Sequence, residues 1–186
     1  MSAIRLLVLG AVRRRARAHG YQVRSDLEAW GAHEWANARS GSIYHALKAM
    51  SGEGLLHTHE TTPSTAGGPP RIEYELTGEG EHAYLSLLRT ALSSREPRLD
   101  LLAAAVGLID DLTRAEAIDL LRQRARAMDQ WRARITEHVP ADADLESWGP
   151  VGEVIGLWLH TADSRAAWTQ QIIQRLEKGS YRMADD

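Results

Sequence analysis

The sequence predicts a mainly helical protein with two domains, and three observations support this fold class. Apolar residues recur at three- and four-residue spacing along most of the 186 residues, which is the helical period. Between residues 55 and 76 the period changes to two, which is typical of half-buried strands. A polar segment with a proline, 95–98, separates this mixed half from a half that is helical throughout. We therefore expect one domain over 1–94 and another over 95–186.

Composition excludes several classes of protein. The chain is 44% apolar and 25% charged, as in folded domains, and no apolar stretch approaches the roughly 20 residues that span a membrane. Cysteine is absent, which excludes disulfides and thiolate chemistry. The arginine cluster near the start follows the first apolar run, whereas in a secretory signal it would precede it. We expect a cytoplasmic protein without a membrane partner, and the abundance of arginine and alanine indicates a bacterial source.

Charge is unevenly distributed along the chain. The formal net charge is −3, yet residues 1–50 carry eight basic and three acidic side chains, a balance of +5. The remaining 136 residues therefore sum to −8. A basic first third is the electrostatic pattern that nucleic-acid-binding domains need.

Three short helices are predicted within the first 53 residues. Apolar spacing predicts helices over about 2–18, 21–30 and 41–53. Gly31 ends the second, and Gly54 follows the third at the position where a left-handed residue is favoured. These helices, joined by tight breaks, form a compact unit.

A two-stranded hairpin follows, with strands over about 55–61 and 72–76. The intervening 62–70 is rich in Gly and Pro and forms a long tip. Thr77 is placed to cap a further helix that ends near residue 94. Three helices followed by such a hairpin is the order of a winged helix-turn-helix, in which the third helix enters a major groove of DNA and the tip reaches phosphates.

The second half is predicted as an antiparallel helical domain. Helices are expected over 99–112, over 113–139 with Thr113 as its cap, and from Pro150 to about residue 178, with Ser147 available as a cap. The last helix, roughly 28 residues, would reach about 42 Å at 1.5 Å per residue. Since so small a protein has too few neighbours to cover it, we expect it to contact a second subunit.

Five motifs carry a family resemblance. They are His19-Gly20-Tyr21, Ser40-Gly-Ser-Ile-Tyr-His-Ala-Leu-Lys48, Glu53-Gly-Leu-Leu56, Gly67-Gly-Pro69 and Tyr74-Glu-Leu-Thr-Gly-Glu-Gly80. In this order and spacing they resemble the PadR family of bacterial transcriptional regulators over about residues 1–92. The second half resembles, in helical layout, the longer subfamily with a helical dimerisation domain. The resemblance implies a homodimeric repressor that leaves a promoter inverted repeat when a small molecule binds.

Candidate DNA-binding residues come from the resemblance and from side-chain chemistry. By position, the resemblance places Ser42, Tyr44, His45 and Lys48 on the exposed side of the recognition helix, Tyr21 near the DNA backbone and Arg71 at the wing. The hydroxyl groups of Ser40 and Ser42 and the amides of that first turn can donate to phosphate. For His45, a packing or surface role is an equal alternative.

The wing departs from the family pattern, because its single Arg71 is followed by Glu73 and Glu75. We expect such a wing to bind phosphate weakly, so that Arg39 and the cluster over 13–17 compensate. The cluster has a second interpretation, in which its side chains only complement the helix dipole.

Four tryptophans of the second half are candidate effector-binding residues: Trp131, Trp148, Trp158 and Trp168. They fit an aromatic-lined pocket for a flat effector. The alternative is that they anchor the core or a dimer interface, which the place of Trp158 on an apolar helix face favours. Trp30 and Trp35 are expected to pack near the recognition helix.

Other patterns predict no chemistry. His57 and His59 share a strand face at a spacing that metals use, but no third ligand is evident, and nothing else supports a pH-sensing role. Catalytic and nucleotide-binding motifs are absent, so we expect no enzyme, cofactor or metal. A rival hypothesis is a winged-helix module that binds protein rather than DNA.

Overall fold

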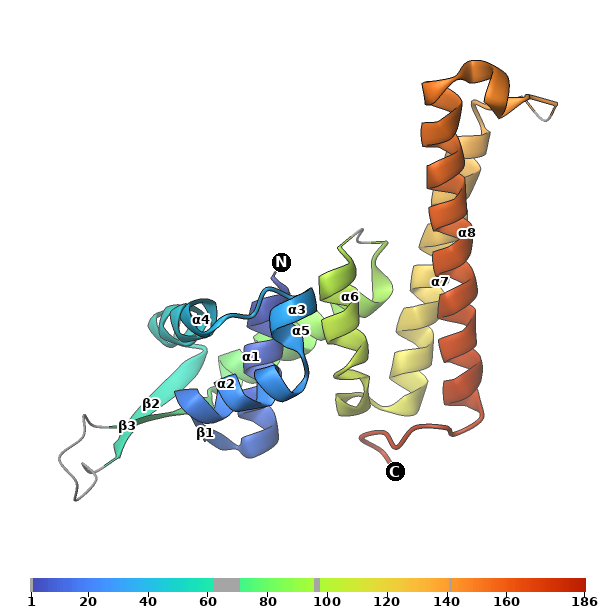
Figure 1. Cartoon of the computed structure of the whole chain (residues 1–186). Coiled ribbons are helices and arrows are strands. Elements are labelled where there is room, and N and C mark those ends of the chain that lie inside the picture. Colours follow the sequence, from blue (N-terminus) through green and yellow to red (C-terminus); the bar gives the residue numbers. More distant parts are fainter. Residues whose placement is uncertain (1, 62–70, 96–97, 141) are drawn as a thin grey trace. The chain divides into compact units, whose positions relative to one another are not determined.

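The computed structural model describes residues 2–61, 71–95, 98–140 and 142–186, which form two compact units (Figure 1). The first unit comprises Met1–Ala91 and Arg98–Leu108, and the second comprises Leu92–Pro97 and Ile109–Asp186. The mainly helical class is confirmed, as are the winged arrangement of the first unit and the helical second half. Within the described residues, no helix has both the length and the apolar character needed to cross a membrane.

The first unit combines helices with one small sheet. Its elements are α1 (Ala3–Arg15), β1 (Arg17–His19), α2 (Gly20–Ala29), α3 (Ala32–Trp35), α4 (Ser40–Gly52), β2 (Leu56–Thr61), β3 (Arg71–Leu76), α5 (Gly78–Ser93) and α6 (Leu99–Val106). Residues 6–12 of α1 are buried on every side, and α1 contacts α2, α4, α6 and β3. Helix α6, which the sequence analysis assigned to the second domain, thus packs in the first unit.

The sheet has a third strand that the sequence analysis missed. The helix expected over 2–18 ends at Arg15, because Ala16 adopts a positive φ of 59°, and Arg17–His19 then pairs with β3. The strand order is β1-β3-β2, antiparallel throughout, so the predicted hairpin is extended on the β3 side. The predicted tip, 62–70, lies outside the described residues.

Thr77 joins the sheet to α5 as its predicted cap. The Thr77 hydroxyl accepts from the Gly80 amide at 2.9 Å and donates to the Gly54 carbonyl at 2.8 Å. Gly54, with φ 77°, ends α4 in the left-handed conformation that its position predicted. One hydroxyl therefore links the end of α4, the sheet and the start of α5.

The second unit is a helical hairpin of α7 (Arg114–Thr136) and α8 (Pro150–Glu177), with short 3₁₀ helices η1 (Ile109–Asp111) and η2 (Leu145–Trp148). Ion pairs of Arg122 with Glu177 and of Arg132 with Asp163 show that the helices run antiparallel. The predicted cap Thr113 accepts from the Glu116 amide.

The two ends of this hairpin differ. At the end near residue 114, Arg114 donates to the carbonyls of Leu176 and Tyr181 and pairs with Asp186, which ties down the chain terminus. At the other end, the first turns of α8 expose Val151 and Leu157, each 62% accessible. One end is closed by hydrogen bonds and the other presents apolar side chains.

Several helix ends predicted in the second half were wrong: the helix expected over 113–139 ends at Thr136. The helix expected over 99–112 stops at Val106, and a 3₁₀ turn follows Gly107. Ser147 does not cap α8: its hydroxyl donates to the Asp144 carbonyl at 2.6 Å within η2. Gly149, with φ 58°, precedes α8, and Pro150 takes the first helical position as expected.

Replacing Gly80 with Ala should destabilise the first unit by at least about 2 kcal/mol. A Cβ at Gly80 would lie 2.0 Å from the carbonyl oxygen of Leu55, and that backbone cannot move without breaking the Thr77 link. Urea unfolding of the full chain measures the effect. Gly78→Ala in the same helix is the control, since no atom lies within 4 Å of its Cβ position. Equal stability of the two variants would contradict the prediction.

Candidate nucleic-acid interface

Helix α4 presents one polar stripe to solvent. Ser40, Tyr44 and Lys48 follow one another at four-residue spacing and are all exposed, with His45 beside them. The opposite face buries Ile43, Leu47 and Met50 completely. The apolar face fixes the helix on the unit, and the polar stripe is free to meet a partner.

The first turn of α4 leaves its amides without a side-chain cap. Arg39 precedes the helix in extended conformation, and its side chain makes no capping hydrogen bond to the first amides. Ser42 differs from expectation: it is half-buried, and its hydroxyl donates to the Arg39 carbonyl at 2.7 Å, on the inner side of the turn. Unpaired amides at a helix start attract anions, and here they lie beside Arg39 and Ser40.

Two tyrosines are exposed in this region: Tyr44 within the stripe is 42% exposed, and Tyr21 on α2 is 48% exposed. A Cβ at Gly20 would lie 2.5 Å from Cε1 of Tyr44, so only glycine allows that ring to rest against the start of α2. Tyr21 stacks on His19 with ring centroids 5.5 Å apart. Burial, and to a lesser extent the nearby Tyr44, raise the pKa of Tyr74. The sequence analysis did not identify Gly20 as a positioning residue.

Most arginines of the first 50 residues are paired with carboxylates. The pairs are Arg5 with Glu53 at 2.5 Å, Arg13 with Glu81 at 2.9 Å, Arg15 with Asp26 at 2.6 Å, Arg17 with Glu75 at 2.9 Å and Arg24 with Glu28 at 3.4 Å. The hydrogen bond from Arg5 lowers the pKa of Glu53 below its usual value. The predicted compensation by the 13–17 cluster is therefore weakened, because these charges are largely neutralised within the unit.

Arg39 and Lys48 differ from these arginines. Both side chains are exposed, and neither forms an ion pair with a residue that the structure describes. They lie at the start of α4 and in its third turn, so the uncompensated charge of this segment concentrates on the polar stripe. Arg71 begins β3 opposite Thr61, and its side chain falls outside the described part of the chain.

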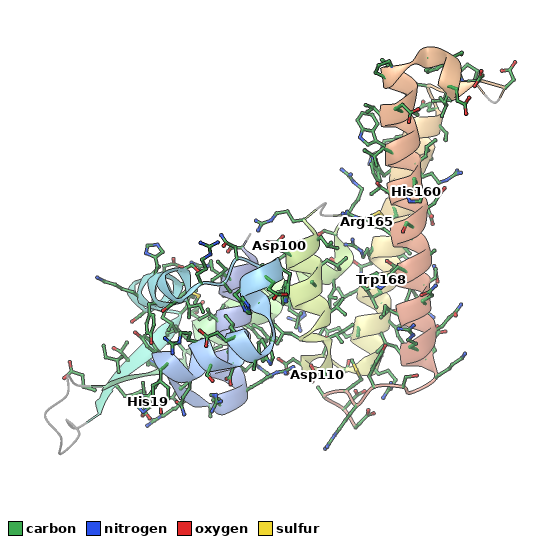
Figure 2. The ribbon with its side chains drawn as sticks, in the orientation of Figure 1. His19, Asp100, Asp110, His160, Arg165 and Trp168 are labelled. Atoms are coloured by element: carbon green, nitrogen blue, oxygen red, sulfur yellow. The ribbon has the colours of Figure 1, made fainter. Side chains whose placement is uncertain are left out.

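A cavity of about 500 Å³ lies in the second unit. Its lining residues are Arg95, Trp131, Arg134, Ile135, His138, Val139, Ile155 and Trp158. Of the four candidate tryptophans, the structure thus brings Trp131 and Trp158 together. Trp148 in η2 and Trp168, which Figure 2 labels on α8, do not line it. Arg95 lies over the Trp131 ring, 4.9 Å from its centroid.

A second cavity, of about 330 Å³, lies in the first unit between α1, α6 and the two tryptophans Trp30 and Trp35. Arg14 also lines it, with its guanidinium 5.6 Å from the Trp30 ring centroid and a hydrogen bond to the Gly107 carbonyl at 3.4 Å. The Trp35 indole donates to the Trp30 carbonyl at 3.2 Å. The sequence analysis expected packing at both tryptophans and did not identify the cavity, because α6 was assigned to the other domain.

His57 and His59 lie on the same face of β2. Their ring centroids are 6.5 Å apart, and no group of metal-binding side chains occurs among the described residues. His59 instead contacts Glu75, with Nε2 2.8 Å from Oε2. That contact is the leading cause that lowers the pKa of Glu75, ahead of Arg17.

The sequence profile of the transcriptional regulator PadR-like family matches residues 8–85. These residues belong to the PadR-like family. The PadR-like segment contains α4, its polar stripe and all three strands, in agreement with the predicted resemblance. No curated protein matches the chain significantly.

Several solved structures are similar to this chain at low identity over most of its length. Bacillus subtilis PadR in complex with operator DNA is 21% identical, covering 92% of this chain and 98% of that one, with a TM-score of 0.42. Bacillus subtilis PadR in complex with p-coumaric acid is 20% identical over 94% and 99%, with a TM-score of 0.37. The Streptococcus mutans protein smu.1604c is 19% identical over 96% and 98%, with a TM-score of 0.42.

Proposed function

We propose that the chain is a homodimeric DNA-binding repressor that leaves its operator when a small molecule binds. The observation that carries the DNA-binding part is the polar stripe of α4. Arg39 lies at the uncapped start of α4 and Lys48 in its third turn, and neither pairs with a described carboxylate, whereas five other arginines of the segment are paired internally. Repression would follow from occupying a promoter.

The proposed docking places α4 in a major groove. Arg39 and the first-turn amides would hold phosphate, and Tyr44, His45 and Lys48 would face the groove wall and base edges. Tyr21 would contact the backbone beside them. Because five arginines are paired, we expect affinity to depend on few phosphate contacts.

Arg39→Ala and Lys48→Ala should each weaken DNA binding about tenfold and reduce the slope of log affinity against log salt by about one. The probe is a labelled duplex from upstream of the protein's own gene, titrated at several salt concentrations. Arg122→Ala is the matched control, because Arg122 pairs with Glu177 in the second unit. Binding that is absent, or independent of salt, would overturn the proposal and favour the protein-interaction alternative.

We propose that two chains associate through the end of the α7–α8 hairpin at which α8 begins. Val151, Val154, Leu157 and Trp158 are all exposed over two turns of α8. Exposed apolar side chains at this density mark interaction sites rather than ordinary surface. A second copy of the chain, related by two-fold symmetry, would cover them and set the spacing of two α4 helices on DNA.

Leu157→Glu should raise the dimer dissociation constant at least about tenfold, since a buried interface centre tolerates no charge. Sedimentation velocity over a concentration series measures it. Gln170→Glu adds the same charge at an exposed polar position of α8 and serves as the control. If Leu157→Glu and the native chain sediment alike, this assignment of the interface is incorrect.

The effector is proposed to occupy the 500 Å³ cavity. Trp131 and Trp158 provide flat apolar walls, while Arg95 and Arg134 provide cationic groups and His138 an imidazole around them. These walls suit a flat aromatic molecule, and the cations suit one that carries a carboxylate. An effector acts only if it binds the DNA-bound and free conformations with different affinity.

p-Coumaric acid should quench tryptophan fluorescence through this cavity, and Arg134→Ala should weaken its binding about fivefold to tenfold. The methyl ester of the same acid is the ligand control, because it keeps the ring and lacks the charge. Equal affinity of acid and ester, or of Arg134→Ala and the native chain, would exclude this cavity as a carboxylate site.

A further inference from the structure

The sheet has an outer face built from titratable and charged residues. In register, Arg17, Glu75 and His57 form one row across the three strands, and His19, Glu73 and His59 form the next. These six residues are the outer sheet face. Ala18 and Tyr74, which alternate with them, are buried on the opposite side. Two glutamates of the central strand thus lie between basic or imidazole side chains on both neighbours.

The contacts across this face are short. Glu75 Oε2 lies 2.9 Å from Arg17 Nε and 2.8 Å from His59 Nε2, while Glu73 Oε1 lies 3.3 Å from His19 Nε2. His19, labelled in Figure 2, also stacks on Tyr21 from α2. The charged and titratable groups facing the three imidazoles are therefore Arg17, Glu73, Glu75 and Tyr21. Both glutamates hold their carboxylates toward imidazole nitrogen.

The charge of the outer sheet face depends on protonation. With neutral imidazoles, one arginine and two glutamates give a net charge of −1; with three imidazolium ions the sum is +2. Histidine is the side chain whose charge changes between about pH 5 and 8. Glu75 stays ionised across that range, because His59 and Arg17 lower its pKa.

We propose that the outer sheet face is a proton-dependent DNA-contact surface, repelling the phosphate backbone when its imidazoles are neutral and attracting it when they are protonated. The inference rests on the proposed DNA-binding function and adds residues that the α4 stripe does not include. The partner is the DNA backbone, since β2 and β3 are the strands of the wing that follows α4. Charges within a Debye length, about 8 Å at physiological salt, act on phosphate without direct contact. By linkage, DNA binding would take up protons.

The test compares DNA affinity at about pH 6 and about pH 8, the limits between which imidazole changes charge, at constant ionic strength. The probe is a labelled duplex of mixed sequence about three helical turns long. Because His45 is a further imidazole at the proposed DNA contact, every chain in this test, the native sheet face included, carries His45→Gln. The chain with the native sheet face should bind about tenfold more tightly at the lower pH, from the added charge on the outer sheet face. In the full chain carrying His57→Gln and His59→Gln, the ratio should fall to about threefold or less.

Two further variants distinguish an electrostatic role of the outer sheet face from a structural one. His82→Gln with His160→Gln removes two other exposed histidines and should keep the native ratio. Glu75→Gln removes a negative charge, so it should tighten binding at about pH 8 by about threefold. A purely structural role of the Arg17 and His59 contacts would instead weaken binding. Circular dichroism confirms folding of each variant.

The experiment distinguishes failure of this inference from failure of the proposed DNA-binding function. If the native chain binds DNA and the His57/His59 variant keeps its pH ratio, the proton-dependent surface is overturned while the DNA-binding proposal stands. If Glu75→Gln weakens binding in a folded chain, the inference is likewise overturned. If the native chain binds no duplex at either pH, the proposed function fails, and the inference fails with it.

Discussion

The burial of α1 on every side is the constraint around which the first unit is arranged. Residues 6–12 contact α2, α4, α6 and β3, so two full turns of this helix hold no charge. Its basic residues are confined to the ends, at Arg5 and at 13–15. From there they reach carboxylates at the C-terminal end of α4, on α5 and on α2. The helix that forms the core therefore also decides where positive charge remains available.

For nucleic-acid recognition, the number of basic residues is a poor measure of basic surface. Exposed ion pairs of the kind found here contribute about 0–1 kcal/mol each to stability. Their larger effect is to cancel the positive electrostatic potential that the basic residues of the first 50 positions would otherwise produce. The positive charge that remains lies at Arg39, at Lys48 and at the first turn of α4, so it is confined to one part of the surface. A focused site of this kind favours orientation of a duplex over strong nonspecific attachment.

The predictions made from the sequence agree with the structure where the residues that determine a feature lie close together in the chain. The end of α4 at Gly54, the Thr77 cap and the full length of α8 all follow from residues within a few positions of one another. Strand β1 was missed because three residues are too few to show a period. The neutralisation of arginines was missed because Glu53 and Glu81 lie 48 and 68 positions from their partners. That Trp131 and Trp158, but not Trp168, share a cavity depends on the register of α7 against α8, which periodicity does not specify.

The side chain of Trp158 belongs to two surfaces at once. It lines the cavity of the second unit, and it is exposed among the apolar residues that begin α8. In the proposed dimer, a molecule in the cavity and a partner subunit on α8 would both contact this indole. Their binding free energies would then be coupled, and each would change the affinity of the other by the same factor. In that proposed dimer, a single residue shared in this way would make the association constant of the subunits a function of ligand concentration.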